Sequence, residues 1–110
     1  MKNIIVYGST TERAFNKLQE LLDNMKQDDI IKVVKAPSIG MFTVKLKNGD
    51  YYIALRASGN VRGYRWQYAY VDKDINQELF DCVVVCKFIP ENLNKEWNPN
   101  IKTEDYYEWY

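Results

Sequence analysis

The chain has 110 residues and a hydrophobic content of 46%, which suits one folded domain and argues against overall disorder. No apolar run reaches the length of a membrane span, and the apolar stretch at residues 4–7 is too short for a signal peptide. The absence of histidine removes the commonest general base, and two cysteines are too few for a usual zinc site. We therefore expect a cytoplasmic protein with buried, reduced Cys82 and Cys86, no metal and no cofactor.

The net charge of zero conceals an uneven distribution of charge. Residues 1–90 carry 13 basic and 10 acidic side chains, whereas residues 91–110 carry 2 basic and 5 acidic ones. Residues 32–65 alone hold seven basic groups and one acid, Asp50. A basic middle and an acidic tail predict either binding to a partner or attraction of the tail to its own domain.

The first half of the chain predicts strand, helix and strand. Residues 3–7 are β-branched and aromatic, as in a strand, and Ser9 with Glu12 forms a capping-box pattern that starts a helix. The helix is expected to end near residues 25–27, with a buried face of Phe15, Leu18, Leu22 and Met25. Residues 30–35 predict a second strand, which Pro37 and Gly40 end.

A hairpin is predicted around Asn48-Gly49, a pair typical of a two-residue type I′ turn. That turn pairs Leu46 with Tyr51 and fixes the register of both strands. It predicts one core-facing set, which comprises Phe42, Val44, Leu46, Tyr51, Ile53 and Leu55, and an opposite face with Lys45, Tyr52 and Arg56.

The remaining elements complete the predicted fold. We expect a strand at residues 67–71, a short helix at residues 74–81 capped by Asp74, and a strand at residues 82–89. The order β-α-β-β-β-β-α-β indicates an α+β fold, or a small α/β fold, in one domain at residues 1–90. Residues 91–110 form an aromatic and acidic C-terminal extension, which we expect to pack on that domain.

Residues 47–74, KNGDYYIALRASGNVRGYRWQYAYVDKD, resemble the segment that leads into the Walker B strand of phage terminase large subunits and related P-loop motor ATPases. Arg62-Gly63 matches the Arg-Gly element of that family, residues 68–71 match its apolar strand, and Asp72 matches the Walker B aspartate. The resemblance implies an ancestry in nucleotide or nucleic-acid handling.

The departures from that family predict that the chain is not an enzyme. The turn at residues 8–13 has one glycine and no lysine, and Glu12 places negative charge where a phosphate would bind. Lys73 follows Asp72, where the family has a glutamate that activates water. Asp72, Asp74 and Asp81 are explained more simply by capping and ion pairing than by a magnesium site.

A loop rich in arginine is the first candidate binding surface. Arg56, Arg62 and Arg65 interleave with tyrosine and tryptophan, a mixture that contacts the backbone and stacks on the bases of single-stranded nucleic acid. The alternative is an exposed face of long amphipathic side chains, with Arg62 paired to Asp72 or Asp74.

The aromatic residues of the tail are the second candidate surface, because tyrosine and tryptophan dominate the binding energy of protein interfaces. The alternative, which the opposite charges favour, is that the tail folds back onto its own basic middle. The candidate partner-binding residues are therefore Arg56, Arg62, Tyr64, Arg65, Trp66, Tyr106, Tyr107 and Trp109.

Two main hypotheses follow. The first is a non-catalytic phage- or mobile-element-like protein that binds and modulates a protein or nucleoprotein complex in the host cytoplasm, for example an anti-CRISPR-like inhibitor of a nuclease or defence complex. The second is a nucleic-acid-binding module derived from a terminase-like ATPase core, and a degenerate or partner-completed ATPase is a third reading. No membrane partner is expected, and the sequence does not determine the oligomeric state.

Overall fold

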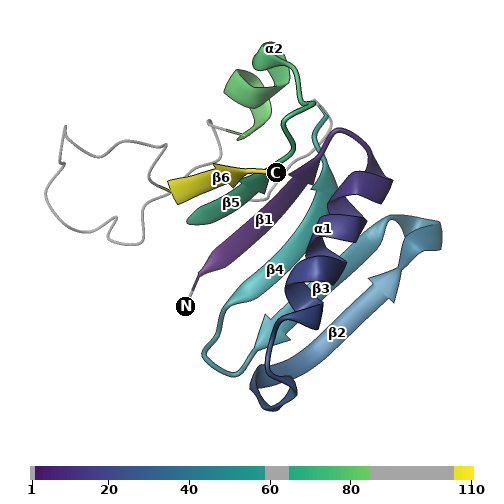
Figure 1. Ribbon diagram of the computed structural model, residues 1–110, viewed down its shortest axis with the longest axis vertical. Helices are drawn as coiled ribbons and strands as arrows, with labels where there is room; N and C mark the ends of the chain where they lie inside the picture. The colour runs from purple at the N-terminus through teal and green to yellow at the C-terminus, as the bar shows by residue number, and fades with distance from the viewer. Residues whose placement is uncertain (1, 59–64, 85–105) are drawn as a thin grey trace, which may run out of the picture.

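The structure, a computed structural model, describes residues 2–58, 65–84 and 106–110. These residues form a mixed α+β domain around one six-stranded sheet, as the sequence predicts (Figure 1). The strands and helices are β1 Asn3–Gly8, α1 Thr11–Asp23, β2 Ile30–Ala36, β3 Met41–Leu46, β4 Tyr51–Arg56, β5 Tyr68–Val71, α2 Gln77–Leu79 and β6 Tyr107–Trp109.

The order of strands across the sheet is β2-β3-β4-β1-β5-β6. β1 pairs in parallel with β4 on one side and with β5 on the other, and β6 pairs in parallel with β5. β3 is antiparallel to both β2 and β4. The carboxyl ends of β4, β1 and β5 therefore meet at one edge of the sheet, which is where open sheets of parallel strands bind ligands.

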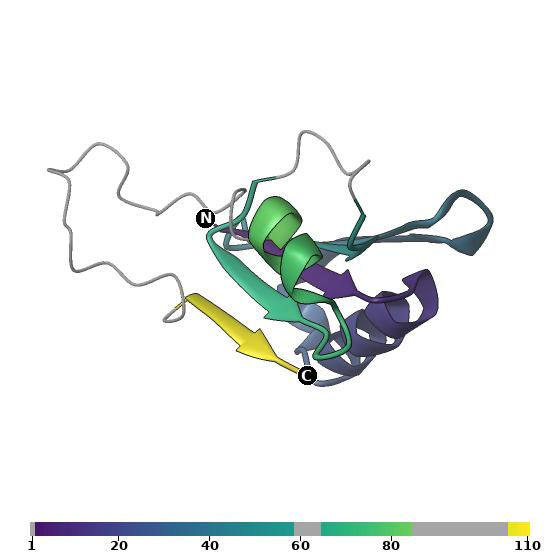
Figure 2. The same ribbon diagram turned by 90° about the horizontal axis from the view of Figure 1, so that it is seen from above.

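Helical segments cover the two faces of the sheet (Figure 2). α1 packs over β1 and β4 and buries a cluster that includes Phe15, Leu18 and Phe42. On the other face, α2 and the π-helical turn Phe80–Val84 bury a second cluster with Ile5, Tyr7 and Trp66. Because both faces are covered, β1 is apolar at successive positions instead of alternating, as expected for a buried parallel strand.

The start of α1 differs from the prediction by one residue. Thr10 is the N-cap, and its hydroxyl oxygen accepts a hydrogen bond from the Arg13 backbone N–H at 3.1 Å. Ser9, the predicted cap, bonds instead to the side chain of Asp72, which directly follows β5. Of the predicted buried face, Phe15 and Leu18 are buried and Leu22 and Met25 are half-buried.

The hairpin forms where predicted, but its register differs by one residue. Thr43 pairs with Ile53 and Val44 with Tyr52, whereas the type I′ turn would pair Val44 with Ile53. Among the described turn residues only Gly49 has a positive φ, 93°, so the two-residue type I′ geometry is wrong here. Asn48 instead accepts a hydrogen bond from the Asp50 N–H at 2.9 Å, as in an Asx turn.

This shift divides the predicted core face between the two sides of the sheet. Phe42, Val44 and Leu46 belong to the cluster under α1, whereas Ile53 and Leu55 belong to the opposite cluster. Tyr52, predicted to share the polar face, packs with the α1 cluster, and Tyr51 is exposed. A register change of one residue moves every side chain of one strand to the other face of the sheet relative to its partner strand. Because apolar clusters lie on both faces of this sheet, the apolar residues can be buried in either register.

The region after β5 also departs from the prediction. Asn76, not Asp74, caps α2, and its side-chain oxygen accepts from the Leu79 N–H at 2.8 Å. Residues 82–84, predicted as the start of a strand, continue the helical turn, which buries Val83 and Val84. Cys82 is exposed on this turn, so its predicted burial is wrong, and Cys86 lies outside the described residues.

The end of the chain adds a strand to the sheet. β6 lies beside β5 and places Tyr107 opposite Ala69 and Trp109 opposite Val71. The Tyr68 hydroxyl donates a hydrogen bond to Glu108 at 2.9 Å, and the Phe80 ring lies 4.9 Å from that of Trp109. Residues 106–110 therefore pack on their own domain, against β5, the α2 region and, through Tyr110, the cluster under α1.

Candidate functional site

The turn from β1 into α1 and the end of β5 form the most elaborate polar cluster in the described chain. Gly8 ends β1, and a β-carbon there would lie 2.5 Å from the Ala14 N and 2.8 Å from the Ala14 Cβ. Only glycine therefore lets α1 start this close to the strand. Because β5 runs beside β1 in the same direction, Asp72 follows Val71 at the point where this turn begins.

The Asp72 carboxylate is buried and accepts hydrogen bonds from three other residues. Its Oδ2 accepts from the Ser9 N–H at 2.8 Å, from the Ser9 hydroxyl at 2.5 Å and from Arg13 Nε at 2.8 Å. Its Oδ1 accepts from Arg13 Nη2 at 2.9 Å and from the Asp74 N–H at 3.0 Å. Arg13 thus holds both carboxylate oxygens in the two-bond geometry that suits a guanidinium.

Two opposing effects act on the pKa of Asp72. Burial disfavours the charged carboxylate and raises the pKa, whereas the hydrogen bonds from Arg13, Ser9 and the Asp74 N–H favour it. The hydrogen bonds prevail, so the pKa lies well below its ordinary value and Asp72 is ionised at neutral pH. The same hydrogen bond and charge raise the pKa of Arg13.

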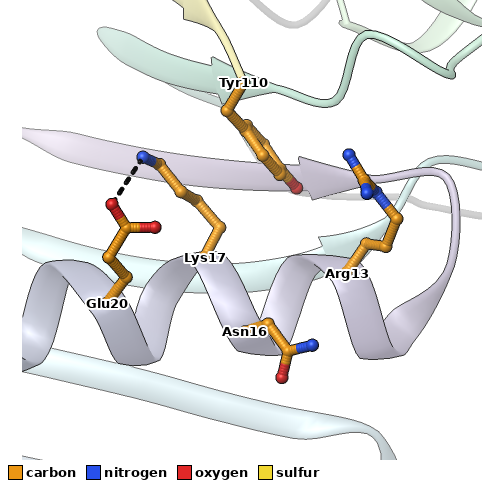
Figure 3. A pocket seen from close by; sticks show the side chains of 5 residues that line it. All are labelled: Arg13, Asn16, Lys17, Glu20 and Tyr110. Atoms are coloured by element: carbon orange, nitrogen blue, oxygen red, sulfur yellow. Dashed lines mark ion pairs between the residues drawn. The ribbon is translucent and has the colours of Figure 1, made fainter.

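Tyr110 closes one side of this cluster. Its hydroxyl donates to the Tyr7 carbonyl oxygen at 2.8 Å, its backbone N–H donates to Val71, and its carbonyl accepts from Lys73 N–H. Figure 3 shows its side chain reaching toward α1 between Arg13 and Lys17. The ring lies 5.9 Å from the Arg13 guanidinium and 5.6 Å from the Lys17 ammonium, within the range of cation–π contacts.

A shallow pocket of about 160 Å³ lies between Tyr110 and α1, lined also by Arg13, Asn16, Lys17 and Glu20. It is smaller than the ~300 Å³ at which ligand pockets usually begin. Lys17 also pairs with Glu20 at 3.6 Å, so this cation is already neutralised in part. The pocket does not offer the enclosed volume that a nucleotide needs.

Three of the backbone donors that a phosphate could use in this corner are already engaged. Ser9 N–H bonds to Asp72, and the N–H groups of Arg13 and Ala14 bond to Thr10. An anion at a helix start depends on such free N–H groups, and the Asp72 charge would repel it. In the part of the chain that the structure describes, no three Asp, Glu, His or Cys side chains gather as metal ligands.

The described arginines of the predicted nucleic-acid surface do not lie together. Arg56 ends β4 beside Gly8, at the carboxyl ends of the parallel strands. Arg65 precedes β5, where the Gln67 N–H bonds to the Asn3 carbonyl at the opposite end of β1. With a rise of about 3.3 Å per residue along β1, the two positions are roughly 15 Å or more apart. Both side chains are exposed, but they face different ends of the sheet.

Trp66 was expected to stack on a partner, and the structure corrects this. Its side chain is 0% exposed, and its indole Nε1 donates to the Val84 carbonyl oxygen at 2.7 Å. It anchors the helical turn after α2 to the sheet and cannot stack on a base. Arg62 and Tyr64 lie outside the described residues, and so does the predicted pairing of Arg62 with Asp72 or Asp74. Among the described residues, Arg13 is the ion-pair partner of Asp72.

The aromatic tail residues serve mainly internal packing. Tyr106 and Tyr107 are half-buried against the cluster that contains Phe80, and Tyr107 lies 5.3 Å from the Phe80 ring. Trp109 keeps an exposed fraction of 50%. Of these three predicted site residues, Trp109 thus offers the most surface to a partner.

Sequence reasoning missed Arg13 and Tyr110 as members of the cluster. Arg13 could have been found if the pairing of β5 with β1 had been known, because the residues that follow two neighbouring parallel strands meet at one edge of the sheet. The pairing of β5 with β1 is a contact between distant segments, however, and no local pattern specifies it. Tyr110 gave no signal, since its position depends on β6 joining the sheet.

Comparison of the chain with protein-family models, with curated proteins and with solved structures finds no match. None of the described helices has the length and apolar character needed to cross a membrane.

Proposed function

We propose that this protein is a non-catalytic binding protein that modulates another macromolecule. The observation that carries the proposal is the Asp72 carboxylate, whose two oxygens accept hydrogen bonds from Arg13, Ser9 and the Asp74 N–H. A carboxylate that binds magnesium or activates a water molecule needs an oxygen that is free to contact the metal or the water. Here an arginine of the same chain takes that position.

The geometry also supports a proposed descent from a P-loop scaffold of the terminase kind. Asp72 directly follows the parallel strand beside β1 and bonds to the turn between β1 and α1, and the resemblance of residues 47–74 matches it to the Walker B aspartate. In this proposal the scaffold has kept its sheet, while the Arg13 guanidinium has taken the place of the magnesium ion as the cationic partner of the acid. Such a domain acts by binding another macromolecule through its surface, without catalysis.

An inhibitor of a host nuclease or defence complex in the cytoplasm, of the anti-CRISPR kind, is the example of this class that we propose. The single-stranded nucleic-acid alternative has less support, because Trp66 is buried and Arg56 and Arg65 lie at opposite ends of β1. Salt dependence separates the two classes of partner. Phosphate contacts weaken steeply as salt rises, whereas an aromatic and apolar protein interface changes little.

The direct test is ATP binding and turnover by the purified chain. We expect neither at millimolar ATP with magnesium, both for the natural chain and for Asp72→Ala. ATP turnover that Asp72→Ala abolishes would overturn the proposal. A labelled oligothymidylate is the second probe, and tight binding that Arg56→Glu with Arg65→Glu removes would establish the nucleic-acid alternative instead.

A further inference from the structure

β2 is the outermost strand on the side of the sheet away from β6 (Figure 1). Within residues 2–58, 65–84 and 106–110, no segment pairs with its outer edge. The outer edge of such a strand presents alternate N–H and C=O groups that another strand can use. β2 has seven residues, so it offers a template somewhat longer than an average strand.

Apolar side chains accompany this open edge. Ile31 and Val33 on β2 are 57% and 42% exposed. A pocket of about 360 Å³ lies beside Val33, on the face that α1 covers. Leu22, Met25 and Ile30 form its apolar lining, and Asp23 and Gln27 lie at it as well. Side chains directly opposite each other on neighbouring strands share a face. A residue opposite Val33 on an added strand would therefore point toward this pocket.

The other face of the edge carries uncompensated positive charge. Lys32 lies directly opposite Lys45 on β3, and neither forms an ion pair with any described residue. Residues 30–47, which form β2, β3 and their connection, contain four lysines and no acidic residue, and of these lysines Lys35 lies on the α1 face, where it donates to Gln19. Like charges directly opposite each other are destabilising, and a carboxylate beside them would relieve the repulsion.

We propose that the β2 edge binds an extended segment of another protein in which apolar and acidic residues alternate, as a seventh strand of the sheet. The apolar residues of that segment enter the pocket beside Val33, and its acidic residues lie beside Lys32, on the same face as Lys45 of the next strand. Main-chain hydrogen bonds supply affinity in this mode of recognition, and alternate side chains supply specificity. The inference rests on the proposed binding function and names the surface and the chemistry of the partner.

A second copy of this chain fits the edge less well than an acidic segment. Pairing of β2 with β2 would place the lysines of both copies along one shared edge, Lys32 on the face away from α1 and Lys35 on the α1 face, where it donates to Gln19. Lysine on an edge strand is a device by which proteins prevent pairing of like edges. The shift in pairing with β3 between Ile30 and Lys32 adds a local irregularity that an identical edge would have to match.

The test uses a capped synthetic peptide of about ten residues, the length that spans an ordinary strand, in which valine and glutamate alternate. Titration into the isotope-labelled chain, followed by amide chemical shifts, should give saturable changes centred on β2 and on Leu22 and Met25. A matched peptide of alternating valine and lysine should bind at least about tenfold more weakly, because its charge opposes that of the edge.

A charge-reversed variant supplies the second readout. Lys32→Glu with Lys45→Glu should weaken binding of the valine–glutamate peptide by about tenfold or more. Lys2→Glu with Lys73→Glu changes the net charge equally at exposed positions away from β2 and should leave binding unchanged. The melting temperature of each variant verifies that it is folded.

Four outcomes would overturn the inference. They are no saturable change, changes centred away from β2, equal binding of the valine–lysine peptide, or a dimer of the free chain whose interface is β2. None of these outcomes bears on ATP turnover, so failure here is distinguishable from failure of the proposed function.

Discussion

Arg13 and Asp72 form a two-bond ion pair across 59 positions of sequence, with Nε–Oδ2 and Nη2–Oδ1 distances of 2.8 and 2.9 Å. The pair joins the first turn of α1 to the end of β5 and so fixes the helix on the central strands. The carboxylate is buried, whereas 42% of the Arg13 side chain is exposed. The arrangement closes the edge of the sheet where a ligand would otherwise bind.

Replacing Asp72 with alanine should lower the free energy of unfolding by about 2–4 kcal/mol, because the Ser9 and Asp74 N–H groups lose their acceptor and Arg13 loses its partner. Chemical denaturation measures this difference. A double-mutant cycle with Arg13→Ala should show a coupling energy between the two sites. An additive cycle would contradict the finding that the two side chains stabilise each other.

The same carboxylate predicts how stability depends on pH. The pKa of Asp72 is lower in the folded chain than in the unfolded one, so its contribution is present above the unfolded value of about 4. The contribution is lost as pH falls below about 4 toward the folded value. Thermal unfolding between pH 2 and 7 should show this loss, and Asp72→Asn should flatten it. An unchanged acid dependence in Asp72→Asn would contradict the assignment.

Tyr110 predicts a dependence at the alkaline end. Burial first, and then the nearby Asp72 charge, raise its pKa above the ordinary value. Its contribution is therefore present below about pH 10 and lost as pH rises above that value, where the unfolded tyrosine ionises. Tyr110→Phe removes the bond to the Tyr7 carbonyl, should cost about 1 kcal/mol at neutral pH and should reduce this alkaline loss. Equal alkaline melting curves for both chains would count against it.

Trp66 distinguishes a structural role from a binding role. Trp66→Phe removes the hydrogen bond to Val84 and leaves a small cavity, so it should destabilise the fold by about 1–3 kcal/mol. Partner binding, measured per folded molecule, should be unchanged. Arg65→Ala is the matched exposed control and should leave the melting temperature nearly unchanged. A Trp66→Phe chain of full stability would refute the structural role.

The hairpin turn gives a test of register. Gly49→Val should cost about 1 kcal/mol or more, since φ at this residue is 93°. Asn48→Asp keeps the side-chain acceptor for the Asp50 N–H and should be nearly neutral. Full stability of Gly49→Val would contradict the positive φ at this residue. The register itself is read from nuclear Overhauser contacts between the strands, which should join Val44 to Tyr52 and Thr43 to Ile53, and not Val44 to Ile53.

Local sequence patterns determined the elements that depend on neighbouring residues. Phe15 and Leu18 recur at helical spacing, and that spacing is sufficient to predict α1 and its buried face. The β-branched runs that became β1 and β2, and the position of the hairpin at Gly49, follow from local backbone preference in the same way. The α+β class follows from the order of these elements.

Tertiary structure decided what depends on contacts between distant segments. Residues 82–84 have a strand-like composition, yet they form a helical turn because Val83 and Val84 bury against the sheet beside Trp66. The register of β3 with β4 was free to shift because both faces of the sheet are buried, so apolar side chains are accepted on either side. Ser9, Arg13 and Asp72 became one cluster only when β5 paired with β1, since local periodicity carries no information about which strands lie side by side.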